Sequence, residues 1–192
     1  MSLTINSNTR ENHGKGASRR LRKENLVPGV IYGGSSEPQS ISFAVNELKK
    51  AIENPAFFTS VIEVTVNGNP EKVIVKALQR HPARAEVLHI DLLRVEENTT
   101  ITTRVPLNFS GAATSAGVKT QGGRLVIESK LAEVRCLPGN LPTELVVDCS
   151  NAQLGDIYHL SDAIVPENVE LVSLLKGEDH NQPIGRIDKS KR

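Results

Sequence analysis

Aromatic residues are scarce in this sequence, which has no tryptophan, two tyrosines and four phenylalanines among 192 residues. A buried core must therefore be built mainly from valine, isoleucine, leucine and alanine. Hydrophobic residues still make up 38% of the chain, which is sufficient for such a core. Because domains commonly span about 100–200 residues, the length allows one large domain or two small ones.

Cysteine is also nearly absent, since Cys136 and Cys149 are the only two. Two cysteines are too few for a disulfide framework or a zinc site, and we expect both to be buried thiols in a reducing compartment. No apolar run approaches the roughly 20 residues that a membrane span requires. The N-terminus has no basic start followed by an apolar stretch, which argues against a secretory signal. We therefore expect a cytoplasmic protein with no membrane partner.

The net charge of +1 conceals an uneven distribution of charge along the chain. Residues 1–95 hold 13 lysines and arginines against nine acidic residues, a net charge of +4. Residues 96–192 hold ten basic and 13 acidic residues, a net charge of −3. Between Arg10 and Lys23 there are six basic residues and one acidic residue. This asymmetry indicates that the N-terminal half has a polyanion as its partner.

Short apolar runs separated by turn residues predict an α+β domain over residues 1–95. Asn67-Gly68 lies between two β-branched runs and predicts a β-hairpin. Sequential antiparallel strands with short turns favour a small six-stranded barrel over a parallel sheet. The expected strands are 4–8, 30–32, 40–43, 61–66, 72–76 and 87–95, and the expected helices are 17–25 and 45–53.

The first expected helix has candidate signals at both of its ends. Ser18 lies near its start and could cap it through the side-chain hydroxyl. Pro28-Gly29 is expected to end it before the next strand begins.

The composition changes at residues 96–98, and residues 96–176 are expected to form a second, mainly β domain. Four glycines and several small residues indicate that 111–123 is a long mobile loop. Residues 177–192 are polar and end in Lys189-Ser190-Lys191-Arg192, so we expect a disordered tail there. The expected strands of this half are 101–109, 125–137, 145–149, 156–160 and 169–175.

The segment from Gly14 to Lys23 is the first candidate for function. A helix N-terminus offers free backbone N–H groups to a phosphate. Arg19, Arg20 and Arg22 add forked donors that can hold phosphate oxygens in pairs. A solvated basic helix is the alternative, although the glycines before the helix favour phosphate binding.

This segment is not a nucleotide-binding P-loop. That motif requires serine or threonine directly after its Gly-Lys pair, and Lys15 is followed by Gly16. The glycines instead allow the backbone to approach a polyanion closely.

His89 and Asp91 form the second candidate, because alternate residues of a strand share one face. An enzyme could use them as an oriented general base. A nucleic-acid-binding protein could use them to stack on a base, or to bond to phosphate, amino or ribose hydroxyl groups. A surface hydrogen-bonded pair is the structural alternative. Matching metal ligands and a nucleophile motif are lacking, so no cofactor is expected.

Tyr32 precedes Gly33-Gly34 and is open to two interpretations. Its ring could stack on a base, or its hydroxyl could bond to a phosphate. Core packing with a tethered hydroxyl explains the same pattern equally well.

Four separated motifs occur in one order over residues 1–95. They are Gly14-Lys15-Gly16-Ala17-Ser18-Arg19-Arg20-Leu21-Arg22, Pro28 with Ile31-Tyr32-Gly33-Gly34, Gln79-Arg80-His81-Pro82, and His89-Ile90-Asp91. Their order and spacing resemble the bacterial large-subunit ribosomal protein L twenty-five family. The second half resembles the long form of that family, the general stress protein Ctc type. It does so at Val105-Pro106-Leu107, Gly122-Gly123, Leu137-Pro138 and Pro166-Glu167-Asn168-Val169.

The resemblance implies an N-terminal six-stranded barrel that binds 5S rRNA in the central protuberance of the large ribosomal subunit. The C-terminal half could contact neighbouring ribosomal proteins. Lys15, Arg22 and Gln79 are added to the implied contacts on physical grounds alone. The positions implied to contact RNA are Arg10, Ser18, Arg19, Arg20, Tyr32, His89 and Asp91.

Three functions are therefore weighed. The first is a non-catalytic ribosomal protein that binds RNA, which the resemblance favours. The second is a hydrolase or transferase that uses His89 and Asp91. The third is a stress protein that binds a protein partner through its acidic C-terminal half.

Overall fold

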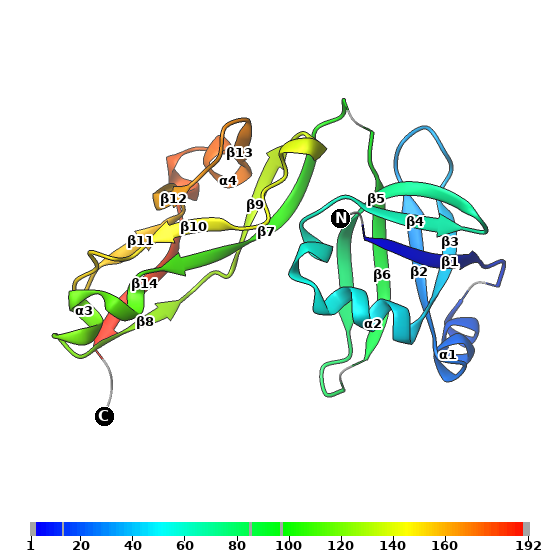
Figure 1. The fold of residues 1–192 in the computed structure, drawn as a ribbon, viewed down its shortest axis with the longest axis horizontal. Helices are drawn as coiled ribbons and strands as arrows, with labels where there is room; N and C mark the ends of the chain where they lie inside the picture. Colours follow the sequence, from blue (N-terminus) through cyan, green and yellow to red (C-terminus); the bar gives the residue numbers. More distant parts are fainter. Residues whose placement is uncertain (1–2, 13, 85, 97, 190–192) are drawn as a thin grey trace. The chain divides into compact units, whose positions relative to one another are not determined.

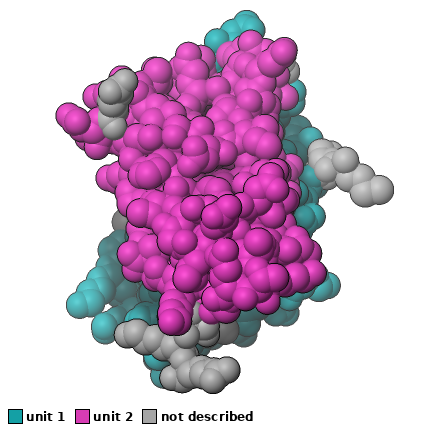
Figure 2. Space-filling model, turned by 90° about the vertical axis from the view of Figure 1, so that its left-hand side faces the viewer, with its two compact units in different colours: residues 1–99 teal, residues 100–192 magenta. Residues whose placement is uncertain are grey.

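The computed structural model describes residues 3–12, 14–84, 86–96 and 98–189. The chain divides into two compact units, residues 1–99 and residues 100–192 (Figure 2). The division falls between residues 99 and 100, whereas the change in composition predicts it between 95 and 96. Each unit has its own sheets and its own buried residues.

The first unit is a closed six-stranded barrel, which confirms the architecture expected for the N-terminal half (Figure 1). Its strands follow one another around the barrel in the order β1-β3-β2-β6-β5-β4. Two of the pairings, β1 with β4 and β2 with β6, are parallel, so sequential antiparallel pairing does not account for the whole barrel. The elements are β1 (Thr4–Thr9), α1 (Lys15–Lys23), β2 (Leu26–Tyr32), β3 (Gln39–Ala44), α2 (Val45–Glu53), a 3₁₀ turn (Pro55–Phe58), β4 (Ile62–Val66), β5 (Asn69–Arg80) and β6 (Val87–Arg94).

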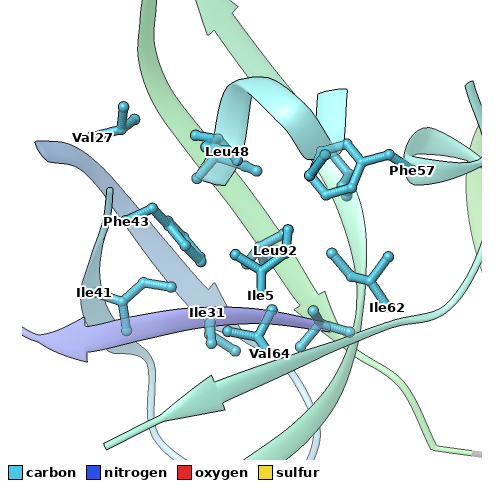
Figure 3. Close-up of a cluster of buried hydrophobic side chains, with 14 of the residues drawn as sticks. Ile5, Val27, Ile31, Ile41, Phe43, Leu48, Phe57, Ile62, Val64 and Leu92 are labelled. Carbon is cyan, nitrogen blue, oxygen red and sulfur yellow. The ribbon is translucent and has the colours of Figure 1, made fainter. Parts of the chain in front are cut away.

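The barrel closes around aliphatic side chains, as the scarcity of aromatic residues predicts (Figure 3). Alternate residues of β4 point inward, so that Ile62, Val64 and Val66 are buried. Helix α2 spans the residues expected and buries Leu48 and Ala51 against this core. Phe43 and Phe57 are the aromatic members of the cluster.

Pro28 and Gly29 do not end the first helix but lie inside β2, which corrects the sequence prediction. Gly29 faces the barrel interior, where an added Cβ would lie 2.8 Å from Ile90 Cγ2 and 3.2 Å from Phe43 Cε2. The glycine is needed there for space. Pairing with β6 begins at Gly29, so Pro28 lies just before that ladder.

Helix α1 begins earlier than expected, after Gly14, and Ser18 is not its cap. Gly14 adopts φ 95°, a left-handed conformation that suits glycine. Its carbonyl accepts the first helical hydrogen bond, from the N–H of Ser18 at 3.1 Å. No side chain caps this end within the described residues.

The second unit contains two sheets, which confirms that this half is mainly β. A five-stranded sheet has the order β12-β10-β7-β9-β13, and a three-stranded sheet has the order β11-β14-β8 (Figure 1). The elements are β7 (Ile101–Ser110), α3 (Ala116–Lys119), β8 (Gly123–Ile127), β9 (Leu131–Cys136), β10 (Leu145–Asp148), β11 (Ile157–His159), β12 (Ala163–Ile164), β13 (Val169–Leu171), α4 (Val172–Leu175) and β14 (Pro183–Lys189).

Two segments of this unit differ from the expectation of mobile or disordered chain. The glycine-rich stretch contains a 3₁₀ turn (Ala112–Thr114) and α3, and the N–H of Gly117 donates to the carbonyl of Ala152 at 2.9 Å. The expected tail contains β14, the middle strand of the smaller sheet, which buries Ile184 and Ile187. Its final residues, 190–192, lie outside the described part of the chain.

The two cysteines, Cys136 and Cys149, are free and buried, as expected. Burial raises the pKa of both thiols. None of the helices among the described residues has the length and apolar character needed to span a membrane.

Candidate nucleic-acid interface

Helix α1 presents most of the cations that the sequence singles out. Its first turn carries no acidic residue, and the last turn carries Arg20, Arg22 and Lys23. Lys15 and Arg19 are exposed, whereas Ser18 is half-buried. Because no side chain caps the described N-terminus, its N–H groups and the positive end of the helix dipole remain available to an anion.

Arg10 and Arg20 line a small hollow beside α1, with a volume of about 140 Å³. The backbone N–H of Arg10 donates to the carbonyl of Ser40 at 3.0 Å, which fixes the start of this side chain. The Arg10 Nε is buried and has no hydrogen-bond partner within the described residues. A buried donor without a partner is costly. Glu11 and Glu24 also line the hollow, so it carries no surplus of positive charge.

Arg22 connects α1 to the barrel wall. Its Nε donates to the carbonyl of Leu88 on β6 at 3.3 Å, one residue before His89. This bond brings the basic helix next to the strand that carries the second candidate motif, although the two lie 66 residues apart in sequence.

His89 and Asp91 lie on the outer face of β6, because Ile90 and Leu92 point into the core. The His89 Nδ1 lies 2.6 Å from the Asp91 Oδ1, and the side chains are 24% and 31% exposed. With Nδ1 engaged by the carboxylate, the Nε2 of His89 is left for an external partner. Gln79 is opposite His89 in the β5–β6 ladder and is exposed.

Tyr32 lies on the neighbouring strand, close to Asp91. Strand β2 pairs in parallel with β6, with Val30 opposite Asp91 and Tyr32 opposite Leu93. Burial, and secondly the negative charge of Asp91, raise the pKa of the Tyr32 hydroxyl. The tyrosine is half-buried on the outer face, an intermediate case between its two sequence interpretations.

The ten predicted residues thus fall into two neighbouring groups. The first group belongs to α1 and to the residue directly after β1, and the second to the outer faces of β2, β5 and β6. Arg22 links the two groups through Leu88. The first group is Arg10, Lys15, Ser18, Arg19, Arg20 and Arg22, and the second is Tyr32, Gln79, His89 and Asp91.

Arg94 is a residue that sequence reasoning missed. Its Nε donates to Glu71 Oε2 at 2.8 Å, and its Nη1 donates to the carbonyls of Glu37 at 3.1 Å and Gly33 at 3.4 Å. These bonds hold the β2–β3 loop directly after Tyr32. No local motif predicts that Arg94 holds this loop, because its partners lie 23 to 61 residues away in the sequence.

The site has the character of a binding surface. His89, Asp91 and Tyr32 lie on the outside of a closed barrel, whereas small-molecule sites are usually concave and enclosed. In the described part of the chain, no three His, Cys, Asp or Glu residues are grouped so that they could hold a metal ion.

Comparison with known proteins identifies the family. Residues 5–92 match the model of the Ribosomal L25p family, and residues 100–191 match the model described as ribosomal protein TL5, C-terminal domain. The large ribosomal subunit protein bL25 of Marinomonas sp. (strain MWYL1) is 64% identical over 192 residues, all of both chains. This chain belongs to the Ribosomal L25p family.

Other relatives of the Ribosomal L25p family also match over most of their length. The bL25 protein of Alcanivorax borkumensis is 45% identical over 97% of this chain and 88% of its own. The bL25 protein of Pseudomonas aeruginosa (strain UCBPP-PA14) is 47% identical over 91% of this chain and 86% of its own. The match of residues 100–191 to the TL5 C-terminal domain confirms the resemblance to the long form of the family. Ribosomal L25p proteins are structural and not enzymes, which removes the hydrolase or transferase interpretation.

Proposed function

We propose that this protein is a structural component of the large ribosomal subunit, in the cytoplasm, and that its barrel binds 5S rRNA in the central protuberance. The close relatives are named as large-subunit proteins, which supports the assembly. The barrel carries the charge excess of the chain and the four ordered motifs of residues 1–95, which supports RNA as its ligand.

The observation that carries the proposal is the bond from Arg22 to Leu88. It brings the last turn of α1 beside the strand that carries His89 and Asp91. Cations alone would bind any polyanion, whereas directed hydrogen-bonding groups next to them can distinguish one RNA shape from another.

The two groups of residues then have different tasks. Lys15, Arg19 and Arg20, with the open N-terminus of α1, hold phosphates and set the position of the protein. Tyr32, His89 and Asp91 bond to base edges or 2′-hydroxyl groups. Double-stranded RNA displays such groups across a wide, shallow minor groove, which the convex barrel wall can approach.

The second unit is proposed to contact neighbouring ribosomal proteins. Its half of the chain is acidic, with a net charge of −3 over residues 96–192, which disfavours direct binding to RNA. The protein requires no cofactor for either task.

The salt dependence of 5S rRNA binding tests the proposal. Each phosphate contact releases counterions, so Arg19→Ala should lower the slope of log affinity against log salt by about 0.7–0.9. Lys119→Ala on α3, in the other unit, is the matched control and should leave the slope unchanged. Filter binding at several salt concentrations measures both. An Arg19→Ala slope equal to that of the wild type would show that Arg19 does not contact a phosphate.

A further inference from the structure

A groove is lined by the end of α1, by α2 and by the β5–β6 turn. Figure 1 shows where these three elements lie in the first unit. It consists of two hollows of about 350 Å³ and 320 Å³. Both are lined by Lys49, Glu86 and Val87, so they form one continuous depression. We call it the basic groove.

The basic groove concentrates positive charge. Two acidic residues, Glu53 and Glu86, also line it, and Glu86 lies 3.9 Å from Arg84. Among the described residues, the other cations of the groove make no ion pair. The groove therefore has a surplus of three positive charges, most of the +4 carried by residues 1–95. Its cations are Arg22, Lys23, Lys49, Arg80 and Arg84.

The shape of the groove suits a chain of phosphates better than a single small anion. Val45, Ile52 and Val87 are among its lining residues, and the cations come from four places along it: α1, α2, the end of β5 and the β5–β6 turn. A small anion requires donors that converge on one point. Cations spaced along a trough instead follow a polyanion backbone.

Internal hydrogen bonds link the described residues of the turn that carries Arg84. The His81 Nδ1 accepts from the backbone N–H groups of Ala83 at 3.2 Å and Arg84 at 3.1 Å. The backbone N–H of His81 donates to the backbone carbonyl of Glu86 at 2.9 Å. These bonds fix the backbone of Arg84 beside the groove, while its side chain is 71% exposed and so accessible to a ligand.

The basic groove is continuous with the α1 surface of the proposed function. Lys15, Arg19 and Lys23 recur every four residues and so follow one side of α1 from its N-terminus to the groove. Arg22 belongs both to the groove and to the bond with Leu88. A polyanion lying on α1 would therefore be led directly into the groove.

We propose that the basic groove binds a second segment of the 5S rRNA backbone, adjacent to the segment held by α1, through Lys23, Lys49 and Arg84. This inference rests on the proposed function. An acidic protein segment is the other polyanion that would fit the groove. The continuous row of cations from α1 favours the RNA.

The test compares the full chain with a variant that carries both Lys49→Gln and Arg84→Gln. If each residue holds one phosphate, the double variant should lower the log–log salt slope of 5S rRNA binding by about 1.4–1.8. Hydroxyl-radical footprinting should show one protected backbone segment lost, while the segment protected by α1 remains. The control is Lys50→Gln with Lys119→Gln, two exposed lysines outside the groove, which should change neither readout.

The outcomes separate the two proposals. If the wild type does not bind 5S rRNA, the proposed function fails and this inference fails with it. If the wild type binds, and the double variant has the same slope and footprint, the inference alone is overturned. Protection of Lys49 from acetylation by a ribosomal protein, with the 5S footprint unchanged, would assign the groove to a protein partner and also overturn it. Equal thermal unfolding midpoints for all three proteins verify that the substitutions leave the fold intact.

Discussion

At the scale of single residues, Asp91 is the most informative member of the interface. A carboxylate near RNA is repelled by phosphates and is favourable only if it accepts a hydrogen bond. In this protein one of its oxygens already lies 2.6 Å from His89. Asp91 can therefore hold His89 in place with one oxygen and accept from an RNA amino or hydroxyl group with the other.

Asp91→Ala should weaken 5S rRNA binding even though it makes the protein more positive. Loss of a directed hydrogen bond of this kind costs about 1–3 kcal/mol, or roughly a ten- to hundredfold loss of affinity. Asp91→Asn keeps the shape of the side chain and removes its charge, so it separates the effect of charge from the effect of the lost hydrogen bond. Tighter binding of the alanine variant, as simple electrostatics predicts, would mean that Asp91 makes no such contact.

Removal of Asp91 has a second consequence, at Tyr32. The charge of Asp91 contributes to the raised pKa of the Tyr32 hydroxyl, after burial. In Asp91→Ala this pKa should move down, towards its ordinary value. An ultraviolet titration of tyrosinate in Tyr158→Phe backgrounds isolates Tyr32, since the chain has two tyrosines.

At the scale of elements, Arg94 ties β6 to the β2–β3 loop. Its side chain is 13% exposed, and its partner Glu71 is 26% exposed. In Arg94→Met the carboxylate of Glu71 and the carbonyls of the loop lose their donor. The free energy of unfolding should fall by about 1–3 kcal/mol, and the amides of residues 33–37 should exchange faster with solvent. Arg104→Met, at an exposed position of β7, is the control and should change neither.

Faster exchange confined to the loop would show that Arg94 positions it, whereas uniform destabilisation of the barrel would assign Arg94 a purely structural role. Unchanged amide exchange and unchanged stability would contradict the proposal that Arg94 ties β6 to the β2–β3 loop. Binding of 5S rRNA provides the functional readout, because the loop directly follows Tyr32.

The elements that could be predicted from the sequence are those whose signal is local. Helix α2 follows from the spacing of Val45, Leu48 and Ile52, and the β4–β5 hairpin follows from Asn67-Gly68. Alternation along β6 likewise predicts that His89 and Asp91 share one face.

The features that the sequence does not reveal depend on distant partners. Gly29 is predicted to break a helix, but its role is set by Ile90, the residue opposite it on the neighbouring strand β6. The sequence of β14 resembles a polar tail, because Ile184, Gly185 and Ile187 are its only buried residues. The strand forms because β11 and β8 pair with it on either side, and no local pattern predicts those partners. The approach of Tyr32 to Asp91 requires the parallel β2–β6 pairing, which no short-range pattern predicts.

At the scale of the whole molecule, charge and structure divide at nearly the same place. The positive excess lies in residues 1–95, and the first compact unit ends at residue 99. The first unit has its own core, which includes Ile31, Phe43 and Leu92. The second buries a separate set that includes Val134, Leu145 and Ile187. Because a domain with its own core can fold alone, the two units are expected to be separable.

The fragment of residues 1–99 should therefore bind 5S rRNA with nearly the affinity and salt dependence of the full chain. It retains both the α1 cations and the outer face of β6, and it ends where the compact unit ends, so no strand of the barrel is lost. The fragment of residues 100–192 is the matched comparison, since it is of similar size but lacks every residue assigned to the RNA. Filter binding of both fragments, after circular dichroism has verified that each is folded, measures the difference. Comparable binding by the folded second fragment would place the affinity outside the barrel, and the division of tasks between the two units would have to be abandoned.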